Sequence, residues 1–87
     1  MATLSSDVLQ DDMAVALARV MATSNKRARE LGVDIFQSLI TITQHFDNGT
    51  FWRINYGPKD YINKRGGDLM IEVGGDDIKI KQVLRGQ

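Results

Sequence analysis

Residues able to support acid–base, nucleophilic or metal chemistry are few in this chain. It has no cysteine and a single histidine, His45, which excludes thiol catalysis, disulfides and cysteine-based metal sites. His45 is expected on the solvent-facing side of a strand, beside Thr43, and no spacing marks a nucleophile or an acid as its partner. We therefore interpret His45 as a surface residue and predict no catalytic residue.

Carboxylates are the remaining metal ligands, and their spacing is unfavourable. Asp76 and Asp77 are adjacent and lack the alternating ligands of a calcium-binding loop. The Gly-Gly-Asp tripeptides at 66–68 and 74–76 fit neither the G-x-x-x-x-G-K-[ST] nor the G-x-G-x-x-G pattern of phosphate-binding loops. We interpret both tripeptides as turns that lead into strands, and we predict no metal and no cofactor.

The charge balance argues against a dedicated nucleic-acid binder. The 87 residues hold 11 Lys and Arg against 11 Asp and Glu, and residues 1–34 hold 4 against 5, so neither part is a basic arm. No apolar run approaches the roughly 20 residues of a membrane span, and the first residues lack the pattern of a secretory signal. We expect a soluble, cytoplasmic single domain over residues 1–87, with neither a nucleic-acid nor a membrane partner.

Residues 6–31 have the period of an amphipathic helix. Apolar side chains recur every three or four positions from Leu9 to Leu31, as on one stripe of a helix. A serine before the helix can cap its start, and Gly32 can end it. The run at 23–25 has low helix propensity, and we expect a kink or fraying there.

Beyond residue 33 the apolar period changes to two, which is typical of strands with one buried face. The expected strands lie at about 35–46, 50–57, 68–73 and 78–85. A three-residue turn with Gly49 left-handed pairs residue 46 with residue 50 and places Ile42 beside Ile54. A two-residue Asn-Gly turn would place these isoleucines on opposite faces, so we favour the three-residue turn.

The segment 74–77 is interpreted as a four-residue hairpin loop between the third and fourth strands. It pairs Val73 with Ile78 and sets Glu72 opposite Lys79, as an ion pair across the two strands. Leu84 then points into the core. The element order predicts an α+β fold in which one long N-terminal helix packs on a curled, four-stranded antiparallel sheet.

Polar groups on the expected core face bear on function. They are Ser38, Gln44 and Gln82, and none of them titrates, whereas an enzyme cavity is expected to hold an acid or a base. This favours a non-catalytic protein-binding module over a ligand-binding or enzymatic module with a cavity between helix and sheet.

A self-associating domain stays open as a third possibility, because the helix leaves one sheet face uncovered and a homodimer can form there. Phe51, Met70 and Val83 are expected on that face.

Residues 57–67 form the longest expected loop, and they contain the predicted partner-binding residues. Tyr61 and Arg65 belong to the types most enriched at interface hot spots, and Lys64 adds a cation beside them. The alternative is that Tyr61 and Ile62 fold back against the edge of the sheet as part of the structure.

The second half of the chain also carries a pattern of glycines around one tryptophan. The residues are Asp47, Gly49, Trp52, Gly66, Gly67, Gly86 and Gln87. Their arrangement resembles that of small bacterial proteins with a cystatin-like or nuclear-transport-factor-like fold, among them immunity proteins of polymorphic toxin systems. The resemblance implies a protein partner, such as a toxin that is neutralised by steric blockade. The Gln-x-Val-x-Gly motif of cystatin-type protease inhibitors is out of register here, which argues against an inhibitor of that kind.

Overall fold

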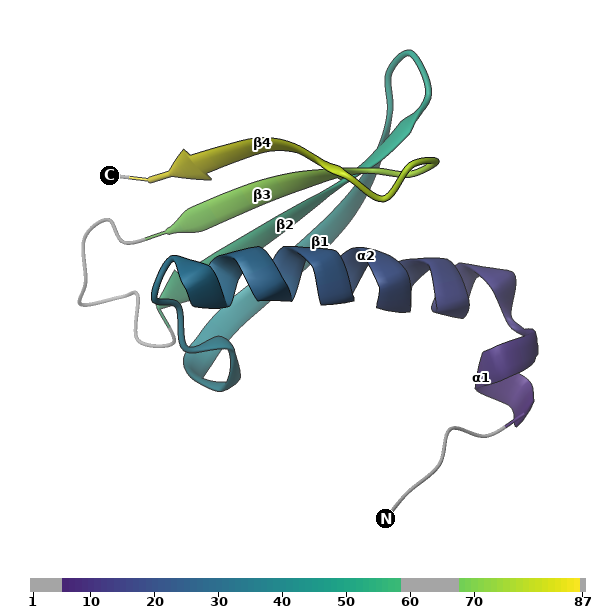
Figure 1. Cartoon of the computed structure of the whole chain (residues 1–87), viewed down its shortest axis with the longest axis horizontal. Coiled ribbons are helices and arrows are strands. Elements are labelled where there is room, and N and C mark those ends of the chain that lie inside the picture. The colour runs from purple at the N-terminus through teal and green to yellow at the C-terminus, as the bar shows by residue number, and fades with distance from the viewer. Residues whose placement is uncertain (1–5, 59–67, 87) are drawn as a thin grey trace.

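The computed structural model describes residues 6–58 and 68–86 and consists of one helical layer on one sheet (Figure 1). In chain order the elements are α1 (Ser6–Gln10), α2 (Asp12–Glu30), a 3-10 turn (Ile35–Gln37), β1 (Ser38–Phe46), β2 (Thr50–Pro58), β3 (Leu69–Gly74) and β4 (Ile80–Arg85). The strands are antiparallel and lie in the order β1-β2-β3-β4. The shortest dimension, 22 Å, fits two layers of about 10 Å each. The expected α+β fold is confirmed.

The helical segment is broken near its start rather than in its middle. The expected single helix over 6–31 is two helices, because Asp11 leaves the helical conformation at φ −92° and ψ 107°. Its carboxylate accepts a hydrogen bond from the Ala14 N–H at 2.9 Å and so caps the first turn of α2. The other end agrees with the prediction, since α2 stops at Glu30 and Gly32 follows with φ +87°.

The polar run in the middle of α2 is regular helix, so the expected kink is absent. Ser24 is completely buried, and its Oγ lies 2.7 Å from the Tyr56 hydroxyl. The same hydroxyl donates to Oδ1 of Asn25 at 2.7 Å. A phenol has one proton to give, so Ser24 is the donor in the first bond. The two helix residues of low propensity thus satisfy the buried polar end of a core tyrosine on β2.

Burial raises the pKa of the Tyr56 hydroxyl, and the Ser24 hydrogen bond and the Arg29 charge offset only part of this rise. The neutral phenol is therefore favoured in the folded chain. The free energy of unfolding that this preference contributes is fully present below the unfolded pKa of about 10, and it is lost as the pH rises beyond that value. We expect the gap in unfolding free energy between the wild type and Tyr56→Phe to narrow above about pH 10. Urea titrations of both proteins from about pH 8 to 11 measure this gap, and a constant gap would contradict the assignment.

The core lies between α2 and the inner faces of β2 and β3. Its buried apolar residues are Val20, Ala28, Trp52, Ile54, Tyr56, Leu69, Ile71 and Val73. The inner face of β1 is less covered than expected, with Ile42 36% and Phe46 76% exposed. The reason is that α2 packs mainly against β3 and, to a lesser extent, β2.

The first hairpin has the predicted register. Ile42 pairs with Ile54, and Phe46 pairs with Thr50 across a three-residue turn. Asn48 and Gly49 both adopt positive φ, 54° and 109°, a conformation that these two residue types tolerate best. β1 is shorter than the strand expected at 35–46, because the 3-10 turn replaces the first three of those residues.

The second hairpin differs from the prediction. Val73 pairs with Ile80 rather than with Ile78, and Ile71 pairs with Val83. Val83 therefore packs against the core and does not lie on the open face. The shift of register falls between Glu72 and Val73 of β3, as at a β-bulge.

This shift also moves the polar residues of β4. Leu84 is 46% exposed instead of buried, and Gln82 lies opposite Glu72 instead of on the core face. The expected Glu72–Lys79 pair is wrong, because Glu72 bonds to Arg53 of β2.

The connection between β3 and β4 is held by contacts that lengthen it beyond four residues. The Gly75 N–H donates to the Thr50 carbonyl at 2.8 Å, which ties the turn to the first hairpin. The Asp77 carboxylate accepts from the Lys79 N–H at 3.1 Å and from Lys81 Nζ at 3.0 Å. The turn closes where the N–H of Gly74, the last residue of β3, donates to the Lys79 carbonyl at 2.8 Å.

Candidate protein-binding surface

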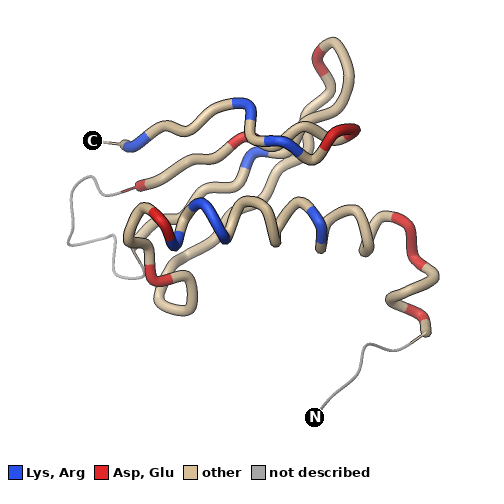
Figure 2. Tube along the Cα trace, in the orientation of Figure 1, with Lys and Arg blue, Asp and Glu red and all other residues tan. Residues whose placement is uncertain are grey.

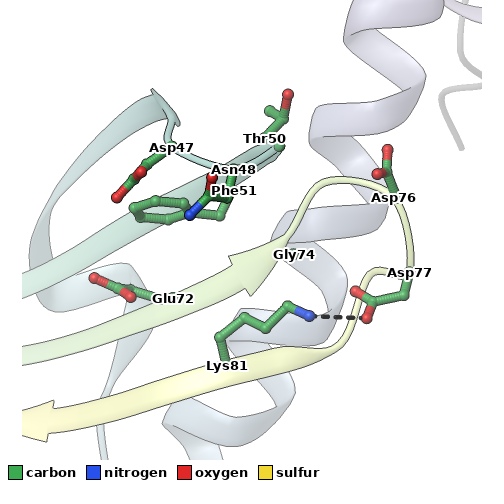
Figure 3. Close-up of a pocket in the computed structure, with 10 residues that line it drawn as sticks. Asp47, Asn48, Thr50, Phe51, Glu72, Gly74, Asp76, Asp77 and Lys81 are labelled. Atoms are coloured by element: carbon green, nitrogen blue, oxygen red, sulfur yellow. Dashed lines mark hydrogen bonds and ion pairs between the residues drawn. The ribbon is translucent and has the colours of Figure 1, made fainter.

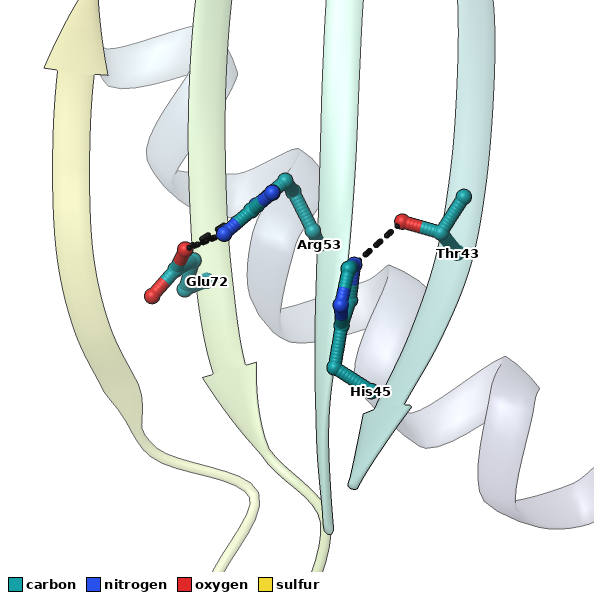
Figure 4. Close-up of polar contacts among 4 residues, drawn as sticks. All are labelled: Thr43, His45, Arg53 and Glu72. Atoms are coloured by element: carbon teal, nitrogen blue, oxygen red, sulfur yellow. Dashed lines mark hydrogen bonds and ion pairs between the residues drawn. The ribbon is translucent and has the colours of Figure 1, made fainter. Parts of the chain in front are cut away.

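The sheet face opposite α2, here called the outer face, carries the side chains of Thr43, His45, Arg53 and Glu72 (Figure 4). By strand alternation its residues are Leu39, Thr41, Thr43, His45, Phe51, Arg53, Asn55, Met70, Glu72, Gln82 and Leu84. Phe51 and Met70 lie on it as predicted, and Leu84 takes the place expected for Val83. The face mixes apolar, aromatic and charged side chains, as the surfaces of protein interfaces do.

An aromatic stack joins β1 to β2 on the outer face. His45 and Phe51 are cross-strand partners, and their rings lie parallel, 8° apart in plane angle, with centroids separated by 4.9 Å. The Arg53 guanidinium carbon lies 6.0 Å from the Phe51 ring centroid, at the limit of a cation–π contact. The Thr43 hydroxyl lies 2.8 Å from His45 Nε2 (Figure 4) and restrains the imidazole from the other side.

An ion pair continues this row onto β3. Arg53 and Glu72 are cross-strand partners, and both Nε and one terminal nitrogen of the guanidinium donate to Oε2 of Glu72, at 3.0 and 2.8 Å. The Glu72 side chain is only 12% exposed, whereas that of Arg53 is 41% exposed. The carboxylate therefore holds the arginine in one orientation while the guanidinium stays accessible to a partner.

His45 stands where the sequence indicated, on the solvent side and beside Thr43. The Thr43–His45 hydrogen bond joins a hydroxyl to a base, as in nucleophilic catalysis. Thr43 is exposed, His45 is stacked on Phe51, and neither lines one of the five main depressions of the described residues. An attacking hydroxyl there would react in open water rather than in the water-excluded surroundings in which catalytic donors act most strongly.

A polar depression of about 330 Å³ lies beside Phe51, where the two hairpin turns meet (Figure 3). Its charged lining residues are Asp47, Glu72, Asp76, Asp77 and Lys81. Lys81 bonds to Asp77 across its edge, and this bond, with the Lys79 N–H, lowers the pKa of the Asp77 carboxyl. Within the described residues no group of three or more His, Asp and Glu side chains is arranged to hold a metal ion.

The glycines at the end of β3 make this close arrangement of turns possible. A Cβ on Gly75 would approach the Thr50 carbonyl oxygen to 2.9 Å, a backbone contact that cannot move aside. This agrees with the interpretation of the second Gly-Gly-Asp tripeptide as a turn rather than a ligand-binding motif.

The described part of the chain carries charges of both signs (Figure 2). Carboxylates gather at the start of the helical layer and in the β3–β4 turn, and cations follow the second half of α2 and β4. No helix in this part of the chain is long and apolar enough to cross a membrane.

The predicted partner-binding residues Tyr61, Lys64 and Arg65 lie outside the described residues, so their assignment stays a prediction. Sequence reasoning did not find the His45–Phe51–Arg53–Glu72 row as a unit. The register predicted for the first hairpin already places His45 opposite Phe51. The contact of Arg53 with Glu72 depends on how β3 pairs with β2, and no local turn signal fixes that register.

Comparisons of the chain with protein-family models, with curated proteins and with solved structures found no match. The function is therefore inferred from the surface of the molecule itself.

Proposed function

We propose that this chain is a non-catalytic protein-binding module whose outer face docks on a partner protein. In the mode suggested by the resemblance to immunity proteins, the partner is a toxin that is neutralised by steric blockade. The observation that carries the proposal is the row of fixed aromatic and charged side chains, His45, Phe51, Arg53 and Glu72, on a face that the fold does not use for its core.

The fixed geometry of this row supports binding for an energetic reason. Ordering a long side chain at an interface costs roughly 0.5–1.5 kcal/mol. Here Arg53 is already held by Glu72, and His45 is held by Thr43 and Phe51. Arginine and aromatic residues are also the types that contribute most at hot spots. A partner surface with an exposed carboxylate or backbone carbonyl beside an apolar patch would complement the row.

The experiment is affinity capture from extracts of the source cells, followed by measurement of the partner's affinity for matched variants. We expect His45→Ala/Phe51→Ala to weaken binding roughly thirtyfold, or about 2 kcal/mol, because both stacked rings are lost. Arg27→Ala/Glu30→Ala is the control, since it removes an exposed ion pair of 3.1 Å on α2 and should leave affinity unchanged. Circular dichroism melts verify that each variant is folded.

A third variant separates the outer face from the loop. Tyr61→Ala/Lys64→Ala/Arg65→Ala tests the residues predicted from the sequence, and a thirtyfold loss confined to it would move the interface to that loop. If all three variants bind the partner as tightly as the wild type does, neither the outer face nor the loop is the interface. The toxin hypothesis has its own test, because cells that produce the captured partner alone should stop growing and should recover when this chain is coexpressed.

A further inference from the structure

β1 is an edge strand without the usual protection. It is the first strand in the sheet order, so within the described residues only its β2 side is paired. Its sequence, SLITITQHF, contains no Lys, Arg, Asp, Glu or Pro, and its pairing with β2 runs over nine residues without a shift of register. Soluble proteins usually place charges, prolines or bulges on such edges, because unpaired backbone groups bind other strands.

β4, the opposite edge, does carry such protection. It is shorter, it contains Lys81 and Arg85, and its register shifts beside Glu72 and Val73. One open edge and one protected edge favour an assembly that closes after two chains, because the outer strands of the pair would both be β4.

The register also shows which backbone groups of β1 point to the free edge. The Thr50 carbonyl accepts a hydrogen bond from Gly75, so the backbone groups of Thr50 point toward β3. Because this direction alternates along antiparallel strands, the groups of its partner Phe46 point away from β2. The residues whose backbone groups face the free edge are Ser38, Ile40, Ile42, Gln44 and Phe46. The N–H of Ser38 already donates to the Ile35 carbonyl in the 3-10 turn, so Ser38 offers its C=O alone.

We propose that two copies of this chain pair antiparallel through β1, about a two-fold axis at Ile42, and form one continuous eight-stranded sheet. Ile42 then lies opposite Ile42 of the second copy, Ile40 opposite Gln44, and Ser38 opposite Phe46. Each edge-facing residue thereby meets an edge-facing residue, and the free groups are satisfied in about eight hydrogen bonds, because the Ser38 N–H of each copy already donates to Ile35. The strand holds no Lys, Arg, Asp or Glu, and His45 lies opposite Leu39 of the second copy, so no like charges meet across the axis.

The same pairing covers apolar surface that a single copy leaves exposed. Ile42 and Phe46 are 36% and 76% exposed on the inner face of β1, because α2 packs mainly against β3 and β2. In the pair, Ile42 packs against its own copy, and Phe46 lies diagonal to Ile40 of the second copy, within reach of a large side chain. The outer faces of both copies stay accessible, so this inference is independent of the proposed function.

Sedimentation equilibrium over a concentration series tests the pairing, and we expect a dimer. Thr41 and Thr43 are exposed and lie opposite one another across the axis, in a pair whose side chains approach closely. Thr41→Lys/Thr43→Lys sets lysine against lysine twice, whereas Thr41→Lys/Thr43→Glu sets lysine against glutamate twice. We expect the dimer dissociation constant to differ by about tenfold between these variants, with the Lys/Glu variant tighter.

A control of equal charge makes the test specific to this register. Thr41→Lys/Asn55→Glu adds the same charges to the same face but leaves the lysine opposite Thr43 of the second copy, so it should not gain the stabilisation of the Lys/Glu variant. A wild-type chain that stays monomeric at its highest attainable concentration overturns the proposal. A dimer whose dissociation constant is equal in the Lys/Lys and Lys/Glu variants overturns it too, because its interface then lies elsewhere, for instance on the outer face.

Discussion

Trp52→Ala is expected to lower the free energy of unfolding by about 3–5 kcal/mol, the usual cost of deleting a large buried aromatic side chain. Trp52 is 8% exposed on the inner face of β2. On the helix side it lies against the first turns of α2, where Met13 and Ala16 line a depression with it. These residues cannot fill the space of an indole. A domain of this size has a total stability of roughly 5–15 kcal/mol, so the loss is a large part of it.

Thermal unfolding of the wild type and the variant measures this effect, and we expect the midpoint to fall by on the order of 15–30 °C. Phe51→Ala is the matched control, because Phe51 is the neighbouring aromatic on the outer face and is only half-buried. Its cost should be clearly smaller. If Trp52→Ala melts within a few degrees of the wild type while Phe51→Ala does not, the assignment of the two faces of β2 is inverted.

Tyr56→Ala is expected to cost a similar amount, about 3–5 kcal/mol, from loss of the ring and of its hydrogen bonds. Tyr56 is the largest of the fully buried side chains. Its hydroxyl lies 2.7 Å from both Ser24 Oγ and Asn25 Oδ1. Tyr56→Phe isolates the polar part, and we expect it to cost about 1–3 kcal/mol because the buried Ser24 hydroxyl loses its partner.

The double variant Tyr56→Phe/Ser24→Ala is the control for this interpretation. It removes both partners at once, so its cost should be smaller than the sum of the two single changes. Urea denaturation of the four proteins gives the coupling energy. Strict additivity, or a Tyr56→Phe variant as stable as the wild type, would mean that the hydrogen bond contributes nothing to holding α2 on the sheet.

Contacts between neighbours in sequence were predictable. The turn at 47–49 fixes the register of the first hairpin through three residues, and its demand for positive φ at Asn48 and Gly49 is visible in the chain itself. The alternation of Trp52, Ile54 and Tyr56 then determines which face of β2 is buried. Gly32 likewise marks the end of α2, because a left-handed residue cannot continue a helix.

Contacts between distant segments were not predictable, and they changed three expectations. Ser24 and Asn25 looked like a weak point of the helix until Tyr56, 32 residues from Ser24, supplied their partner. The β3–β4 turn looked like a four-residue loop. Its Gly75 is bonded to Thr50 of the first hairpin, and the sequence of the turn alone does not indicate this contact. The position of α2 over β3 and β2 left Ile42 and Phe46 of β1 exposed.

The candidate surface likewise combines contacts that the sequence determined with contacts that it did not. The sequence determined that His45 and Phe51 share a face, because one short turn sets their register. Only the tertiary structure decided that Arg53 meets Glu72 instead of leaving that glutamate to Lys79. The physical reason is that a turn fixes only the two strands that it joins, whereas the pairing of β2 with β3 and the register of β4 depend on packing energy summed over the whole sheet and its helix.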